Sequence, residues 1–389
     1  MNGRLFVLLL LICLLATSTG CWNNTDLTEI AICTALGIDR TLDDKIMVSV
    51  QIVKPSAARS SGKEGGGGTE GGKDKSFVVV SNTADTVFGA LREMLNRLNK
   101  KIFYNSTQVI VIGEEAAESG INEYLDFFER DHESQYKADV VVAKGITAKK
   151  ILEQEYDLAN VPGAYISDTL KNTSERGMVK RTLLIDAVKE ISSEQKQLAL
   201  GTILKVGDTT ETNGTAVFKK GNMVGWLGRF DTRGYLFATG RVESTILELP
   251  SLSGAGKYVG IELIRSNSKM NLRWKNGTPG FVVKIEAQGN IGEQHANDGL
   301  KEQNILEKLI PLCNEKIKSE VMSAVSKCRN QFKSDIFGFG EALYKNNPNY
   351  WNAVQKNWNE AGFLEAEIIV EVDTKLFRSG LLKETVESR

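Results

Sequence analysis

"AICTALGID", residues 31–39, is an almost unbroken apolar stretch with the length of one strand. A short apolar run of this kind is typical of a strand that is buried on both faces of a sheet. IMVSVQIV at residues 46–53 alternates as a partner strand does, and Asp43-Asp44 between the two stretches suits a tight turn. The sequence therefore predicts a buried strand pair from which a sheet extends. Asp39 and Arg40, directly after the first strand, predict a salt bridge or a turn.

Strands and helices alternate over the next hundred residues. We expect strands at residues 77–81, 109–112 and 138–143, and helices at residues 83–98, 121–129 and 148–155. The first helix carries one apolar stripe, because its apolar residues recur at intervals of three and four. Residues 159–200 are mixed and mainly helical, most clearly at residues 183–191. This alternation predicts an α/β layer in which helices pack on a sheet.

The pattern changes near Gly201. KKGN at residues 219–222 predicts a hairpin turn between strands at residues 215–218 and 223–227, and residues 237–242 lead to another strand. Further strands are expected at residues 257–265, 270–274, 281–287 and 365–377, with helices at residues 300–334 and from Asn347-Pro348 onward. Since these strands alternate and the helices are amphipathic, they predict an antiparallel sheet covered by helices on one side.

The predicted fold class is therefore α+β or α/β with several domains, built from mixed sheets packed with helices. Residues 21–200 form an N-terminal α/β region that could divide into two subdomains, and residues 201–389 form a C-terminal α+β domain. Residues 55–75 contain four consecutive glycines at 65–68 and predict a disordered, glycine-rich loop. The loop is either a passive linker or a recognition segment.

The first 20 residues are typical of a bacterial lipoprotein signal peptide. Arg4 precedes an apolar run from Leu5 to Ala16, and Ser18-Thr19-Gly20 leads to Cys21. Twelve residues in a helix span about 18 Å, which is too short for the roughly 30 Å hydrocarbon layer of a bilayer, so the run is a processing signal. Cys21 is the predicted lipid-attachment residue and the first residue of the mature chain. The alternative is ordinary secretion, with Cys21 incidental.

Charge and cysteine usage exclude several classes of protein. Removal of residues 1–20 takes away one basic residue, so 47 basic and 49 acidic side chains remain and the net charge is −2. A nucleic-acid partner needs clustered excess cations, and none is expected. Cys33, Cys313 and Cys328 have no disulfide or metal-binding spacing and are predicted to be small buried apolar residues.

The sequence offers little material for catalysis. Its only two histidines, His132 and His295, lie in polar surroundings and are predicted to be solvated. No phosphate-binding loop, nucleophile elbow or HExxH motif occurs. Asp335 to Glu341, DIFGFGE, is the densest motif, and we interpret it as a packing element that directs Phe337 and Phe339 inward. No catalytic, cofactor-binding or metal-binding residue is predicted.

Several segments, in this order, coincide with one known family. These are Gly20-Cys21-Trp22 with residues 27–39, LDFFERD at 125–131, residues 215–227, Asp335 to Glu341 with Asn357-Trp358, and Arg378-Ser379-Gly380. Over nearly the whole mature length the chain resembles the Ger(x)C spore germination lipoproteins, the C subunits of nutrient germinant receptors.

The resemblance implies a non-enzymatic subunit that needs no cofactor. Its N-terminal diacylglyceryl and acyl modification would hold Cys21 in membrane lipid, on the outer face of the spore inner membrane. Its partners would be two integral membrane subunits of the receptor, and the resemblance leaves open whether this chain contacts the nutrient. Two alternatives are a lipid-anchored solute-binding protein of a transporter, with a two-lobed cleft, and a surface hydrolase.

Overall fold

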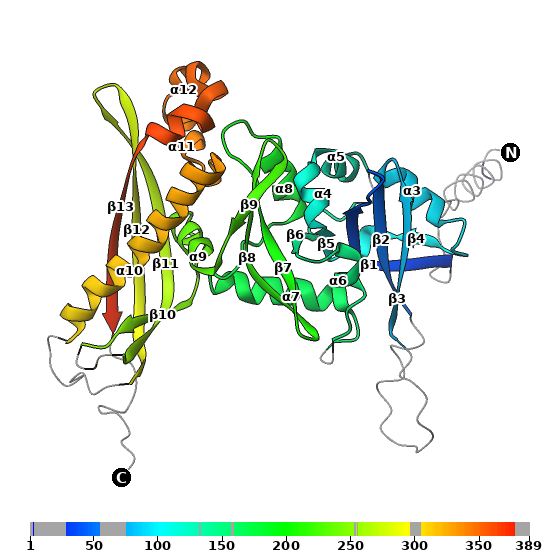
Figure 1. Cartoon of the computed structure of the whole chain (residues 1–389), viewed down its shortest axis with the longest axis horizontal. Coiled ribbons are helices and arrows are strands. Elements are labelled where there is room, and N and C mark those ends of the chain that lie inside the picture. The colour runs from blue at the N-terminus through cyan, green and yellow to red at the C-terminus, as the bar shows by residue number, and fades with distance from the viewer. Residues whose placement is uncertain are drawn as a thin grey trace, which may run out of the picture.

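The computed structural model describes residues 29–54, 75–131, 134–156, 159–252, 256–295 and 305–377, together with residues 3 and 254. Cys21, His132, most of the predicted loop (residues 55–74) and residues 378–380 lie outside the described residues. Figure 1 shows two sheets that follow one another along the long axis of the molecule, both packed with helices.

The first sheet has nine strands in the order β3-β2-β1-β5-β6-β7-β8-β9, and β4 pairs with β1. Their bounds are β1 (Ile30–Arg40), β2 (Ile46–Val53), β3 (Phe77–Ala84), β4 (Lys101–Phe103), β5 (Val109–Ile112), β6 (Asp139–Lys144), β7 (Ala199–Val206), β8 (Thr209–Lys219) and β9 (Asn222–Leu227). β1, β5, β6 and β7 run parallel to one another, whereas the outer strands on both sides are antiparallel. The predicted strand pair β1–β2 is confirmed, with Leu36 opposite Val50.

Helices cover both faces of this sheet. They are α3 (Val87–Met94), α4 (Glu114–Ser119), α5 (Asn122–Arg130), α6 (Ala148–Leu152), α7 (Pro162–Glu175) and α8 (Leu184–Ile191). Ile110 and Ile112 of β5 belong to the core under α3, α4, α5 and α8, whereas Val109 and Val111 belong to the core under α6 and α7. Burial on both faces is why the central strands are apolar without alternation.

Asp39, at the end of β1, holds the start of α6. Its carboxylate accepts hydrogen bonds from the backbone N–H groups of Ala148 at 2.7 Å and Lys149 at 2.9 Å. Burial raises the pKa of the Asp39 carboxyl, and these two hydrogen bonds oppose that rise. An acidic group at a helix N-terminus is stabilised by the free N–H groups there, so Asp39 fixes α6 against the sheet.

The second sheet has four strands in the order β10-β11-β12-β13. Their bounds are β10 (Thr245–Pro250), β11 (Tyr258–Lys275), β12 (Thr278–Gln294) and β13 (Glu367–Phe377). The helices of this half are α9 (Arg229–Ala238), α10 (Ile305–Lys327), α11 (Phe339–Asn346), α12 (Pro348–Val354) and α13 (Phe363–Glu365), with short helical turns η3 (Cys328–Phe332), η4 (Gln355–Asn357) and η5 (Trp358–Gly362). In Figure 1, α10 crosses one face of the sheet, and one core joins the sheet to α9, α10, α11 and α12.

The prediction that the C-terminal sheet is antiparallel was wrong for its last strand. β10, β11 and β12 are antiparallel, but β13 pairs with β12 in parallel, from Gly280 opposite Glu367 to Asn290 opposite Phe377. A parallel neighbour requires a long crossover, and the helices between residues 305 and 365 supply it. The sheet is therefore mixed.

The first sheet also continues beyond residue 200, where we placed a domain boundary. β7, β8 and β9 all pair within it, although residues of β8 and β9 such as Val217 and Leu227 also enter the core of the second sheet. The change of pattern at Gly201 marks the change from parallel to antiparallel pairing within one sheet.

Two local predictions need correction. Residues 237–242 do not lead directly to a strand: α9 ends at Ala238 and β10 begins at Thr245. The expected strands at 257–265 and 270–274 are one strand, β11, with an irregular register between Leu263 and Arg265.

Candidate docking surface

The described residues hold no cluster of three or more His, Cys, Asp or Glu that could bind a metal ion. Cys33, Cys313 and Cys328 are free and buried, as predicted. Burial raises the pKa of the Cys33 thiol to about 12, so this group is protonated and poorly nucleophilic at neutral pH. His295 is half-exposed and its Nε2 lies 3.0 Å from Glu293 Oε1, which confirms that its surroundings are polar.

Within the described ranges, no helix is long and apolar enough to cross a membrane.

A groove of about 1010 Å³ lies between α3 and α5, which we call the α3–α5 groove. The groove is lined by Phe88, Leu91 and Leu95 on the α3 side and by Phe127 on α5. Ile102 of β4 and Tyr104, directly after β4, line it as well. The Phe88 side chain is 54% exposed, whereas Leu91 and Ile102 are buried. The Phe88 and Phe127 rings are 6.4 Å apart between centroids. The groove is therefore an open apolar surface continuous with the core.

On each wall, the aromatic residue that lines the groove stands next to an apolar residue of the core. Val87 is buried in the core while the adjacent Phe88 is exposed in the groove, and Phe128 is buried while Phe127 is half-buried in the groove. The prediction for α3 rested on its core stripe alone and did not indicate the groove. An additional aromatic residue beside each stripe was the signal that could have indicated it.

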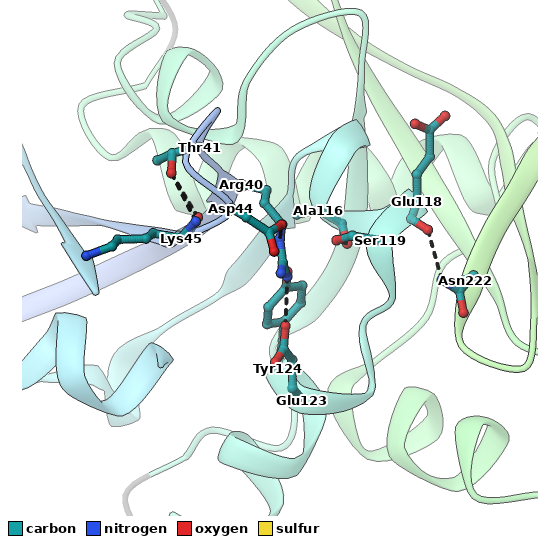
Figure 2. A network of polar contacts seen from close by, with 10 residues as sticks. All are labelled: Arg40, Thr41, Asp44, Lys45, Ala116, Glu118, Ser119, Glu123, Tyr124 and Asn222. Carbon is teal, nitrogen blue, oxygen red and sulfur yellow. Dashed lines mark hydrogen bonds and ion pairs between the residues drawn. The ribbon is translucent and has the colours of Figure 1, made fainter. Parts of the chain in front are cut away.

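Arg40 fixes the start of α5 to the turn between β1 and β2 (Figure 2). Its Nε donates to Asp44 Oδ1 at 2.6 Å, and its Nη1 donates to Glu123 Oε1 at 3.0 Å and to Tyr124 Oη at 3.3 Å. The guanidinium of Arg40 lowers the pKa of the Asp44 carboxyl. For Asp39-Arg40 we predicted a salt bridge or a turn: Arg40 forms salt bridges with Asp44 and Glu123, whereas Asp39 accepts hydrogen bonds from the start of α6. The Arg40 contacts position one wall of the groove.

The other side of α4 and α5 is held by the β8–β9 turn. Asn222 Nδ2 donates to the backbone oxygen of Glu118 at 3.0 Å, which Figure 2 also shows, and Ile121 N donates to the backbone oxygen of Gly221 at 3.0 Å. Lys220 and Gly221 have φ values of 52° and 89°, the backbone of a tight hairpin turn, as predicted. The α5 wall is therefore attached to β1 through Arg40 and to the β8–β9 turn through Ile121.

The DIFGFGE motif is a packing element, as we interpreted it. The fully buried Asp335 carboxylate accepts hydrogen bonds from the backbone N–H groups of Gly338 at 3.0 Å, Phe339 at 3.2 Å and Gly340 at 2.8 Å. Phe337 and Phe339 are buried in the core of the second sheet. The Asp335 carboxylate and the two phenylalanine rings therefore all make internal contacts, and the motif offers no open binding surface.

Comparison with known proteins relates both halves of the chain to spore germination proteins. A profile described as "Spore germination protein N-terminal domain" matches residues 23–205, and one described as "Spore germination B3/ GerAC like, C-terminal" matches residues 213–380. The chain belongs to the Ger(x)C family. Between the two matched regions lies the turn that joins β7 to β8, inside the first sheet.

Ger(x)C relatives align with this chain over almost its full length. Spore germination protein KC of Bacillus subtilis (strain 168) is 25% identical over 382 residues, 93% of this chain and 92% of that protein. Spore germination protein B3 of the same organism is 21% identical, over 97% of this chain and 96% of its own length. The crystal structure of the GerBC protein matches with a TM-score of 0.55 at 18% identity, over 88% of this chain and 96% of that one. The predicted fold class of mixed sheets packed with helices is confirmed.

Proposed function

We propose that this chain is a lipid-anchored, non-enzymatic subunit of a nutrient germinant receptor and that it acts in nutrient-triggered spore germination. The observation that carries the proposal is the match of both halves of the chain, in order, to spore germination profiles. The lipoprotein signal that ends at Cys21 supports the anchor. Acyl chains on Cys21 would hold the protein on the outer face of the spore inner membrane.

The anchor also explains how the subunit would assemble with its partners. A protein confined to the membrane plane meets integral membrane partners at high effective concentration, so modest docking surfaces are sufficient for assembly. Two integral membrane subunits are the proposed partners. In this proposal the chain is a folded scaffold that binds no nucleic acid, cofactor or metal.

Substitution Cys21→Ala tests this proposal in spores. We expect the variant protein to leave the membrane fraction and nutrient germination to fall strongly, while germination by a trigger that bypasses the receptors persists. Cys33→Ala is the matched control, because Cys33 is a buried thiol in β1, outside the predicted signal. Full membrane retention of the Cys21→Ala protein would contradict the anchor, and unchanged nutrient germination in spores that lack the protein would contradict the receptor role.

A further inference from the structure

The α3–α5 groove exposes an aromatic surface that the described residues leave uncovered. Phe88 is 54% exposed, and the Arg92 guanidinium lies over its ring at 5.4 Å from the centroid. Leu91 and Ile102, which also line the groove, are 6% and 3% exposed and belong to the core, so the open surface is continuous with the core. Contiguous apolar surface of this kind, with a polar rim, is typical of an interaction site.

The dimensions of the groove suit one helix. Its walls, α3 and α5, are 8 and 9 residues long, which corresponds to about 12–14 Å of helix. A guest helix of about 10 Å diameter would therefore place two turns against them, with apolar side chains at positions i, i+3 or i+4, and i+7. Phe88 and Phe127, at 6.4 Å between centroids, would contact those anchors.

The groove also lies close in the chain to the proposed anchor. β4, which carries Lys101 and Ile102 of the groove, pairs with the first residues of β1, with Ile30 opposite Lys101. Ile30 follows Cys21 by nine positions, and a fully extended chain of that length spans at most about 30 Å. The groove is therefore held within reach of segments that project only a short way from the bilayer.

The charges of the rim favour a protein rather than a lipid surface. Three basic side chains line the groove, Arg92, Lys101 and Arg130, and three acidic ones, Glu123, Asp126 and Asp131. Anionic lipid attracts basic clusters, whereas this rim has no net charge. Arg92 on α3 and Glu123 on α5 stand on opposite walls, so a guest helix with charges of both signs would bind in one orientation.

We propose that the α3–α5 groove binds an amphipathic helix, just outside the bilayer, that belongs to an integral membrane subunit of the receptor. This inference rests on the proposed function and locates the contact. Phe88 and Phe127 supply the aromatic contacts, and Arg40, through Glu123 and Tyr124, keeps the α5 wall in place.

Phe88→Glu tests the inference with a matched control. Phe88 is the second residue of α3, where an acidic side chain favours the helix N-terminus, so the variant is expected to fold. Phe230→Glu is the control, because Phe230 is also the second residue of its helix, α9, and is 55% exposed. α9 lies between the two sheets, away from α3 (Figure 1).

The measurement is recovery of the integral receptor subunits with the full-length lipoprotein from detergent-solubilised spore membranes. We expect Phe88→Glu to reduce this recovery about tenfold or more, as loss of a central aromatic contact does, and Phe230→Glu to leave it unchanged. Equal recovery with wild type and Phe88→Glu would overturn the groove assignment alone. If wild type recovers no integral subunit, the proposed function fails as well.

A photoreactive phenylalanine analogue at position 88 identifies the occupant directly. We expect a covalent adduct with an integral receptor subunit, mapped to a helical segment outside the bilayer, and none from the same analogue at position 230. An adduct with lipid alone, or with a second copy of this chain, would overturn the inference.

Discussion

The carboxylate of Asp335 accepts a hydrogen bond from the indole Nε1 of Trp358 at 2.9 Å, with both side chains buried. The same carboxylate accepts three backbone N–H groups from residues 338–340, and the backbone oxygen of Asp335 accepts from Gln197 N at 2.9 Å. Asp335 thus ties the start of α11 and the turn η5 to the segment just before β7. Burial raises the pKa of this carboxyl while its hydrogen bonds oppose that rise.

Replacement of Asp335 should therefore destabilise the protein strongly. Asp335→Ala would leave four buried donors without their acceptor, and we expect the free energy of unfolding to fall by about 3 kcal/mol or more. Asp335→Asn should cost less, because one side-chain oxygen remains to accept. Urea denaturation of the 22–389 fragment, followed by tryptophan fluorescence, measures the loss. Asp373→Asn on the exposed side of β13 is the control, and equal midpoints for Asp335→Ala and this control would show that the network contributes nothing.

Gly340, in the same motif, is required for close packing. A Cβ atom there would lie 2.6 Å from the backbone oxygen of Gln195 and 2.7 Å from the Trp351 ring. We expect Gly340→Ala to lower the free energy of unfolding by about 1–3 kcal/mol, the usual cost of overpacking. Gly292→Ala is the control, because a Cβ at Gly292 would meet its neighbours only at 3.7 Å or beyond. A thermal midpoint for Gly340→Ala within error of Gly292→Ala would refute the steric argument.

Local patterns predicted much of this fold. The apolar run at 109–112 predicted β5 with correct bounds, Lys220-Gly221 predicted the β8–β9 turn, and Asn347-Pro348 predicted the start of α12. In each case a few adjacent residues determine the conformation. The inward Phe337 and Phe339 were also predicted from the motif alone.

Features that depend on distant partners were not predictable in this way. α9 has no polar stripe over Thr232 to Ala238, because all of these residues are buried between the two sheets. Gly234 weakens the helical pattern further, yet it is needed because a Cβ there would collide with the backbone of Glu320 in α10. The parallel pairing of β13 is likewise set by how far the preceding helices carry the chain. The α3–α5 groove combines two helices and β4, so no single stretch of sequence contains it.

Lys180 makes stability depend on pH. Its ammonium group is fully buried, 3.6 Å from Glu190 Oε1, and burial lowers its pKa to about 7. Below pH 7 both folded and unfolded states bind this proton, so the burial penalty is constant. Between about pH 7 and pH 10.5 the unfolded state retains the proton that the folded state has lost. This lysine therefore makes stability rise with pH across that window, by up to about 1.4 kcal/mol per pH unit.

Lys180→Met should remove this dependence. Glu190 keeps its ion pair with Lys196 at 2.7 Å, so no charge is left without a partner. We expect the variant to gain stability relative to wild type at pH 6 and to gain less, or nothing, at pH 9. Denaturant midpoints at both pH values measure this, and Lys189→Met, an exposed lysine on α8, corrects for general charge effects. A gain that is the same at pH 6 and pH 9 would be inconsistent with a lowered pKa for Lys180.

Arg40→Ala should loosen α5 without unfolding the protein. The substitution removes the contacts of the guanidinium with Asp44, Glu123 and Tyr124. Since Asp44 and Glu123 are exposed, they return to water at little cost, whereas the hydroxyl of the buried Tyr124 loses its partner. We therefore expect a global loss of only about 1 kcal/mol.

The local effect of Arg40→Ala should be larger. Amide hydrogen exchange over residues 121–131 should accelerate, because the start of α5 would open without global unfolding, while exchange in α8 stays at its wild-type rate. Lys345→Ala is the control, since Lys345 forms an exposed pair with Glu341, at 2.6 Å, within α11 and away from the groove, and such pairs contribute about 0.3–0.5 kcal/mol. If the groove is the docking surface, Arg40→Ala should also weaken recovery of the membrane subunits, less than Phe88→Glu does. Faster exchange with undiminished recovery would mean that the position of the α5 wall does not matter for docking.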